Sequence, residues 1–441
     1  MSSFLLGFAS ATLPCKSAMM IASPRPAIRA HSNQGASNTF LSSKGFREPF
    51  LHLLRFPQNN VRDIAPSQNM AIKDMDNRNC RDVGVAAPPT VMDMAGEWRD
   101  GVGIIDFLER RNFLVTGATG FVAKVLIEKI LRVAPNVGKI FLLIKAKDQQ
   151  AAMDRVKDEI IGCELFICLK QKYGEEYTSF MLSKLVPVKG DIQESNMGIG
   201  NDSFRQITQE VDVIVNSAAN TTFDERMLDP LILSYGKGRL PGFLVDPDTV
   251  IDVIPADLVA NVTIAAMAKH GTTASPSIDV YHAASSTVNP IMMCDVFNYS
   301  RDYFAASPLT DDQGDEIQIT DMEYFSSIDS FSSYIQRDIA EKSGLSKEIG
   351  PNSNPKQRSR LEARCKRMAE SIIHLAKLYE PYMFYRARFD SWNTRKLMEQ
   401  MSTEEGNKFP IDLRSINWED YFANAHIPGL KRHVIKKASS S

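Results

Sequence analysis

The sequence lacks the usual marks of a metal-binding, disulfide-rich or membrane-spanning protein. Its six cysteines are scattered, and no two have C-x-x-C spacing. That distribution predicts neither a zinc site nor a disulfide framework, and it indicates a reducing compartment. No uninterrupted apolar run reaches the roughly 20 residues of a transmembrane helix. The net charge of -2 gives no electrostatic argument for a nucleic-acid partner. The chain of 441 residues, 44% hydrophobic and 24% charged, has the composition of a globular protein of two or three domains.

Acidic residues are missing from the start of the chain, where Glu48 is the first. The segment before it contains nine serines and the basic residues Lys16, Arg25, Arg29, Lys44 and Arg47. Such a composition is typical of an organelle transit peptide, and the uncharged, serine-rich beginning favours the plastid (chloroplast) over the mitochondrion. A tail without a targeting role is the alternative. We therefore expect residues 1–70 to be a transit peptide and residues 71–98 to be a linker.

The stretch "FLVTGATGFVAK", residues 113–124, combines a short apolar run, a glycine turn and the start of an amphipathic helix. Small residues at three-residue spacing let a backbone approach a diphosphate, and the N-terminus of the helix supplies unpaired N–H donors. The pattern predicts a dinucleotide-binding loop, because a strand precedes it and a helix follows it. The residues expected to contact the nucleotide here are Thr116, Gly117, Thr119, Gly120, Phe121 and Val122.

The next apolar run, "KIFLLIK", ends at Lys145, with Lys147 close behind. In a pocket for NAD an acidic residue usually closes this strand and binds the ribose hydroxyls. A cation at the same place suits the 2′-phosphate of NADP, whereas the plain alternative is a solvated lysine at the end of a strand. The sequence thus favours NADPH as the cofactor.

Two further runs, "KLVPVKGDI" and "VDVIVNSAAN", read as buried parallel strands after a long helical stretch at 150–173. Asp191 and Ile192 end the first strand, where the adenine edge is expected. Asn216 and Ala218 end the second, beside the expected nicotinamide. The alternation of strands and helices predicts an α/β fold with a doubly wound parallel (Rossmann) sheet.

Residues 291–433 are predicted to form a mainly helical domain. The clearest helix is "PKQRSRLEARCKRMAESIIHLAKLYEPY", whose predicted apolar face comprises Leu361, Cys365, Met368, Ile372 and Leu375. Many cations crowd its first half. They form either a solvated face or a surface for an acidic carrier protein. The histidines of this region (His374, His426 and His433) lack metal-ligand spacing, so we interpret them as structural and predict no metal site.

Several segments resemble the plant fatty acyl reductases of the male-sterility type, in the extended short-chain dehydrogenase/reductase superfamily. They are "FLVTGATGFVAKVLIEKILRVAPNVGKIFLLIKAKD", "VDVIVNSAANTTFDER", "YGKGRLPGFLVDPDTVIDVIPADLVANVTIAAMAKH", "YEPYMFYRARFD", "INWEDY" and "HIPGLKRHV", and they cover most of residues 97–433. The resemblance implies reduction of a long-chain acyl-CoA or acyl-acyl carrier protein to a primary alcohol with two NADPH. It also implies a role in plastid lipid metabolism for the pollen wall.

The resemblance implies that catalysis requires a Tyr-x-x-x-Lys pair and an upstream Ser or Thr. This chain lacks the pair. None of its twelve tyrosines has a lysine four positions later. Tyr235 is followed by Lys237, in what we expect to be a loop. The segment "TTFDER" runs directly into "MLDPLILSYGKG", which the family places well after the catalytic helix. We therefore predict an internal deletion near residues 225–227, an incomplete sheet with an unpaired edge, and no catalytic residues.

The predicted domains are a nucleotide-binding domain at 99–290, the helical domain at 291–433 and a tail at 434–441. Three functions stay open at this point. The first is a plastid fatty acyl-CoA reductase by family, impaired or inactive as this chain. The second is a non-catalytic NADP- or acyl-binding protein that pairs with a full-length relative. The third is another extended reductase, such as an epimerase. The sequence does not indicate an oligomeric state.

Overall fold

The computed structural model describes residues 101–218, 228–271, 278–311, 313–343 and 355–435, with backbone alone at 355–357 and 434–435. Backbone alone is also described for four short strands: β1 (Phe4–Ala9), β2 (Ala18–Ala22), β3 (Val91–Met92) and β4 (Trp98–Arg99). The predicted join near 225–227 lies outside the described residues.

Four parallel strands form the centre of the fold, in the order β8-β5-β6-β7. They are β5 (Phe113–Thr116), β6 (Ile140–Ile144), β7 (Leu185–Lys189) and β8 (Val213–Asn216). Every residue of β5, β6 and β8 is buried, as expected for parallel strands covered on both faces. The arrangement confirms the predicted doubly wound α/β sheet.

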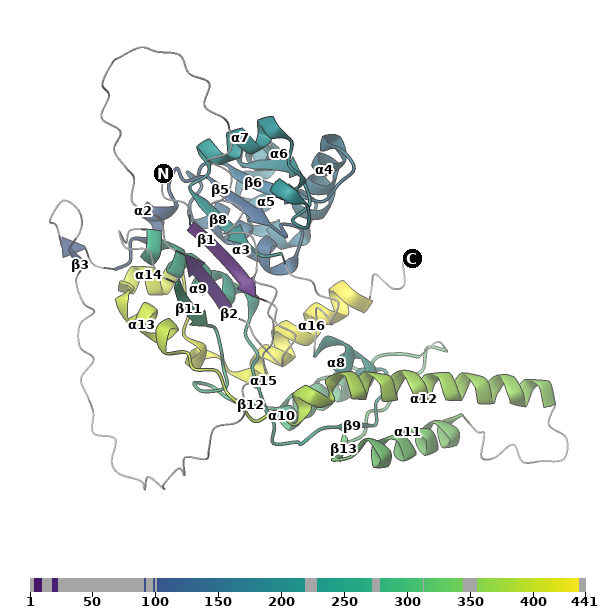
Figure 1. The fold of residues 1–441 in the computed structure, drawn as a ribbon. Coiled ribbons are helices and arrows are strands. Elements are labelled where there is room, and N and C mark those ends of the chain that lie inside the picture. The colour runs from purple at the N-terminus through teal and green to yellow at the C-terminus, as the bar shows by residue number, and fades with distance from the viewer. Residues whose placement is uncertain are drawn as a thin grey trace, which may run out of the picture.

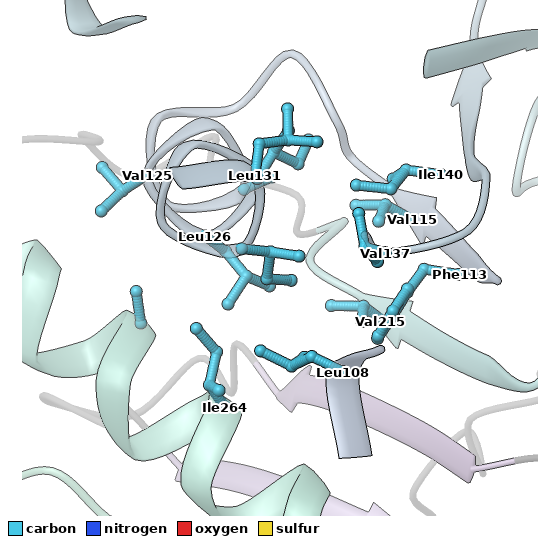
Figure 2. Close-up of a cluster of buried hydrophobic side chains, with 14 of the residues drawn as sticks. Leu108, Phe113, Val115, Val125, Leu126, Leu131, Val137, Ile140, Val215 and Ile264 are labelled. Carbon is cyan, nitrogen blue, oxygen red and sulfur yellow. The ribbon is translucent and has the colours of Figure 1, made fainter. Parts of the chain in front are cut away.

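Helices cover both faces of this sheet. On one face lie α2 (Ile104–Leu108), α3 (Phe121–Val133) and α9 (Ala256–Gly271), and on the other lies α7 (Asn201–Glu210). Figure 2 shows Leu126 of α3 and Ile264 of α9 lying toward Val115 and Val215 of the strands. The neighbouring strand residue Ile214 faces the opposite way, into the cluster that contains Ile207 of α7. Because successive side chains of a strand point to opposite faces, each strand contributes to the hydrophobic clusters on both faces of the sheet.

The stretch expected to be helical, 150–173, is helical except for a break at residues 162–163. The segment forms α4 (Gln149–Val156), a π turn η1 (Lys157–Ile161), a 3₁₀ turn η2 (Glu164–Phe166) and α5 (Ile167–Tyr173). The break has a local cause, because Cys163 has extended backbone angles and the Gly162 N–H bonds to the Lys157 carbonyl instead of continuing the α pattern. A second 3₁₀ turn η3 (Gly174–Glu176) and α6 (Tyr177–Lys184) lead into β7.

The other side of the sheet holds β1, β2 and β11 (Ile278–His282), in the order β11-β2-β1-β8 (Figure 1). β1 runs parallel to β8, with Leu5 opposite Ile214, and β2 runs antiparallel to both β1 and β11. We expected the incomplete sheet to leave an unpaired edge, and this was wrong for β8, the outer of the four parallel strands, because it pairs with β1. The backbone groups of an open edge need partners, and the apolar segment "FLLGFA" provides them. The targeting role predicted for the same segment stays a prediction.

The C-terminal region is mainly helical, as predicted. Its strands β12 (Ile291–Met292) and β13 (Glu323–Phe325) pair with β10 (Val250–Ile251) and β9 (Gly242–Leu244), which come earlier in the chain, after α8 (Asp229–Gly236). Its helices are α10 (Met293–Ala306), α11 (Ile328–Lys342), α12 (Pro355–Met383), α13 (Trp392–Gln400), α14 (Thr403–Lys408), α15 (Trp418–Asp420) and α16 (Ile427–Leu430). Its shorter turns are η5 (Leu413–Ser415), η6 (Tyr421–His426) and η7 (Lys431–Ile435), whereas η4 (Ser195–Gly198) lies between β7 and α7. No helix in the described ranges is long and apolar enough to cross a membrane.

The long helix α12 packs against α11, and the two lie side by side away from the sheet (Figure 1). Its buried face contains Ala369, Ile372, Ala376 and Tyr379. Met368, which we predicted for this face, is 39% exposed. A single partner helix covers only a narrow stripe, so a residue one position away from the stripe meets solvent.

A buried carboxylate joins the helical region to the nucleotide-binding domain. Glu405 of α14 accepts hydrogen bonds from the backbone N–H groups of Val102 and Ile104, both at 2.8 Å, and of Ser402 at 2.9 Å. Gly103, which precedes α2, has no side chain to cap that helix, so a residue some 300 positions away does so.

Candidate nucleotide-binding site

The turn after β5 requires glycine at position 117. Gly117 has a φ of 65°, in the left-handed region. A Cβ atom there would lie 2.7 Å from both the Ala218 nitrogen and the Ser217 oxygen. The backbones that follow β5 and β8 therefore meet directly, and no side chain stands between them.

The turn closes into the N-terminus of α3. The Gly120 N–H donates to the Gly117 carbonyl at 2.9 Å, and Gly120 has extended backbone angles as the N-cap residue. No side chain caps this end of α3. Its first N–H groups, including those of Phe121 and Val122, are thus available to an anion. The side chain of Phe121 is 64% exposed beside this end.

A buried polar contact holds the ends of β5 and β8 together. The Thr116 hydroxyl donates to the Asn216 side-chain oxygen, and both residues are fully buried. The same oxygen accepts from the Ala218 N–H at 3.3 Å, and the Ser217 N–H donates to the Thr116 carbonyl at 3.2 Å. Thr116, Gly117, Asn216 and Ala218, all predicted from the sequence as site residues, therefore form one unit. Thr119 lies half-buried in the turn itself.

Lys145 and Asp191 form an ion pair, with 2.8 Å between Lys145 Nζ and Asp191 Oδ2. The hydrogen bond between them raises the pKa of Lys145 and lowers the pKa of Asp191. The sequence showed no acid at the end of β6, but the fold brings one there from the end of β7. This pairing was missed because strand order is needed to see it. The neighbouring Ile192 is half-buried and packs into the cluster on the α7 face.

Tyr235 lies in α8, not in a loop as expected. Its hydroxyl donates to the Thr320 carbonyl at 2.5 Å, and the side chain is only 2% exposed. Burial raises the pKa of Tyr235 to about 12. A buried tyrosine whose proton is already engaged is poorly suited to protonate a substrate. Within the described ranges no cluster of three His, Cys, Asp or Glu side chains is arranged to hold a metal ion.

Comparisons with known proteins find relatives of this chain. The family model described as "Male sterility protein" matches at residues 115–229, and a second model of the same description matches at 356–437. The chain is 35% identical to "Fatty acyl-CoA reductase 2, chloroplastic" of Arabidopsis thaliana, over 82% of this chain and 85% of that protein. It is 25% identical to the "Alcohol-forming fatty acyl-CoA reductase" of Simmondsia chinensis, over 75% of this chain and 99% of that protein.

Among solved structures, the terminal R domain of the myxalamid biosynthetic pathway aligns with 73% of this chain and 91% of its own, at 11% identity and a TM-score of 0.45. The alignment with the chloroplastic relative is longer than the part of this chain that it covers. The alignment with the chloroplastic relative extends over 522 positions, although 82% of this 441-residue chain is only about 360 residues. About 160 positions of that relative therefore have no counterpart here.

The level of identity and the extent of coverage decide against the epimerase considered above. The glycine turn and the strands β6, β7 and β8 lie within the first matched range, and the second matched range contains α13 to α16 and nearly all of α12. This protein belongs to the fatty acyl-CoA reductase family.

Proposed function

We propose that this chain binds NADPH and a long-chain fatty acyl thioester but reduces the thioester to a primary alcohol weakly or not at all. The observation that carries the proposal is a complete nucleotide turn in a chain without a Tyr-x-x-x-Lys pair. Such a chain keeps the residues that hold the cofactor and lacks those that deliver the proton.

An internal deletion accounts for this combination. The first family match ends at residue 229, close to the predicted join. The positions of the chloroplastic relative without a counterpart here number about 160 in total, enough for a strand with the catalytic hydroxyl and the helix with the tyrosine and lysine. The sheet is consistent with such a loss, because β8 and β11 are separated by two strands that come from the start of the chain.

The preference for NADPH rests on Lys145. The lysine is exposed at the end of β6, next to the expected ribose, and it neutralises Asp191. An unpaired carboxylate there would repel a 2′-phosphate, whereas the pair presents an ammonium group that can turn toward it. The proposed site comprises this pair with Ile192, the turn residues 116–122, Asn216 and Ala218.

The substrate is proposed to be a long-chain acyl-CoA or an acyl-acyl carrier protein, in the plastid. The names of the relatives support the acyl-CoA class and, for one of them, the chloroplast. The acid-poor, serine-rich leader supports the same compartment. A role in the pollen wall follows from the family resemblance alone.

The test is turnover before and after repair. General acid–base groups typically contribute about 10²–10⁴-fold to rate, and lost positioning of substrate and nicotinamide adds to that deficit. The purified chain should therefore show little acyl-CoA-dependent NADPH oxidation while still binding NADPH. Inserting the missing segment of a full-length relative between Glu225 and Met227 should restore alcohol formation. The matched control is the same insert with phenylalanine for the motif tyrosine, which should stay inactive. Alcohol formation at ordinary enzyme rates by the unrepaired chain would contradict the proposal.

The alternative is a binding protein that acts with a full-length relative. The intact nucleotide turn is compatible with it as well. If it holds, adding this chain to a full-length relative should change that enzyme's kcat/KM and yield a complex by size-exclusion chromatography. If the first proposal holds, the two proteins should elute separately.

A further inference from the structure

A cavity of about 270 Å³ lies at the carboxyl end of β11, between α9 and α13. The helical period explains its walls. Leu258 and Val262 lie one turn apart on α9, and Thr394, Arg395 and Met398 follow at three- and four-residue spacing on α13. Ile411 and Leu413 add apolar surface from the segment after α14. The walls are thus mixed, with apolar side chains from α9, α13 and the segment after α14 beside polar and charged ones.

Ser391 gives the cavity an unsatisfied hydrogen-bonding group. The residue is 5% exposed, lines the cavity, and its hydroxyl has no hydrogen-bond partner among the described residues. Ser391 is the N-cap residue of α13, where a serine usually accepts an N–H from the first turn. Here Asp390 Oδ1 accepts a hydrogen bond from the Trp392 N–H at 2.9 Å, and the Ser391 hydroxyl does not cap the helix. A buried hydroxyl without a partner is unfavourable, and a polar ligand atom in the cavity would satisfy it.

The polar wall around Ser391 is held in place. The Thr394 hydroxyl donates to the His282 carbonyl at 2.8 Å, and His282 Nδ1 lies 2.7 Å from the Asp390 carbonyl. A carbonyl only accepts, so Nδ1 carries the hydrogen of this bond. The Thr394 hydroxyl and His282 Nδ1 therefore already have hydrogen-bond partners, whereas the buried Ser391 hydroxyl has none among the described residues.

The charges at the cavity favour an anion. Arg414 is bound by Asp412, with 2.9 Å from Nε to Oδ1 and from Nη2 to Oδ2. Arg395 is exposed and lies over the Trp392 ring at 5.3 Å. A cation stacked on an aromatic ring keeps its N–H groups available at the ring edge. The cavity therefore combines apolar side chains in its walls, an inner hydroxyl and a cation at an exposed position.

The cavity is separate from the expected nicotinamide position but lies at the same edge of the sheet. β11 runs in the same direction as β8 and stands three positions away in the strand order. At roughly 4.8 Å between strands, this is about 14 Å. A hydride cannot cross that distance, so a ligand bound here is a remote part of the substrate and not its reacting carbon.

We propose that this cavity holds the phosphopantetheine arm of the acyl thioester, an inference that rests on the proposed acyl-thioester substrate. The arm has apolar methylene and methyl groups for the walls and amides that hydrogen-bond with the Ser391 hydroxyl. It ends in a phosphate for Arg395. A bare acyl chain would leave the hydroxyl unsatisfied and the cation unused. The arm is common to CoA and acyl carrier protein, so one cavity serves both carriers.

The test measures binding of free 4′-phosphopantetheine, CoA and dodecanoate to the full chain by calorimetry. Ser391→Ala should weaken binding of phosphopantetheine and CoA by about 3- to 10-fold, the value of one hydrogen bond. Arg395→Gln should weaken both by about tenfold or more and flatten the dependence on salt. The matched controls, Lys396→Gln beside the cavity and Ser333→Ala on α11, should bind as the unaltered chain does. NADPH affinity and the unfolding midpoint, measured for every variant, verify the fold.

The outcomes separate this inference from the proposed function. CoA binding that neither Ser391→Ala nor Arg395→Gln weakens would overturn the cavity assignment and leave the proposed substrate standing. Dodecanoate binding that both changes weaken would assign the cavity to the acyl chain and overturn the inference. Absence of any CoA or phosphopantetheine binding at millimolar concentration would overturn it too. Loss in both variants, with dodecanoate unaffected, supports it even in a chain that reduces nothing.

Discussion

The replacement of Gly117 by alanine tests the nucleotide turn most directly. A non-glycine residue in the left-handed region costs about 1–2 kcal/mol, and Gly117 has a φ of 65°. The added Cβ would also lie 2.7 Å from two backbone atoms of residues 217 and 218, which cannot rotate away as a side chain would. Forcing such a contact apart typically costs about 1–3 kcal/mol. We therefore expect Gly117→Ala to lower the free energy of unfolding by about 2–5 kcal/mol.

The same change should weaken nucleotide binding. Relief of the contact moves the turn away from Ala218 and shifts the N–H groups at the start of α3. Losing one hydrogen bond to a charged group is worth about 1.5–3 kcal/mol, which is at least about tenfold in affinity. Urea unfolding followed by circular dichroism measures the first effect, and titration of NADPH fluorescence measures the second.

Gly406→Ala is the matched control. Gly406 lies inside α14, and a Cβ atom there would have no heavy atom within 4 Å. Alanine at an unstrained helical position should leave the free energy of unfolding unchanged or raise it by about 0.5–1 kcal/mol, without effect on NADPH. If Gly117→Ala behaved like Gly406→Ala in both assays, the turn would not have the described geometry and the diphosphate would bind elsewhere.

Three other outcomes are expected. The unaltered chain should bind NADPH more tightly than NADH, and Lys145→Glu should abolish that preference while Lys147→Glu retains more of it; equal affinities in the unaltered chain would refute the assignment of Lys145. Residues 1–70 fused to a fluorescent protein should enter plastids, and cytosolic or secreted fluorescence would show the leader to be something else. Glu405→Ala should lower the free energy of unfolding by about 3–5 kcal/mol, because three backbone N–H groups lose a charged acceptor. Glu404→Ala should change the free energy of unfolding little, because its ion pair with Lys408 is exposed. Similar unfolding curves for the two variants would count against this role of Glu405.

Local patterns in the sequence determined the elements of the nucleotide site. The apolar run at 113–116, the glycines and the amphipathic helix after them predict strand, turn and helix within some twenty residues. Each of these features depends on neighbours a few positions away, so one sequence suffices to see them. The same holds for the absence of Tyr-x-x-x-Lys, which is a property of spacing alone.

Helix boundaries and the buried faces of helices were harder to predict from such patterns. The stretch 150–173 has helical composition throughout, yet Cys163 takes extended angles and divides it. Met368 has the right spacing for the apolar face of α12 but lies outside the stripe that α11 covers. Periodicity predicts which residues share one face of a helix, whereas the width of the buried stripe on that face depends on the helix that packs against it.

Only the tertiary structure decided which groups meet across long separations. Asn216 reaches Thr116 from 100 positions away, Asp191 reaches Lys145 from the next strand, and Glu405 caps α2 from the far end of the chain. The pairing of β1 with β8 and the cavity at Ser391 are likewise assembled from distant segments. Buried polar groups and strand edges need partners, but their chemistry does not specify where along the chain a partner comes from. Strand order and the packing of helices specify that, and they emerge only when the chain has folded.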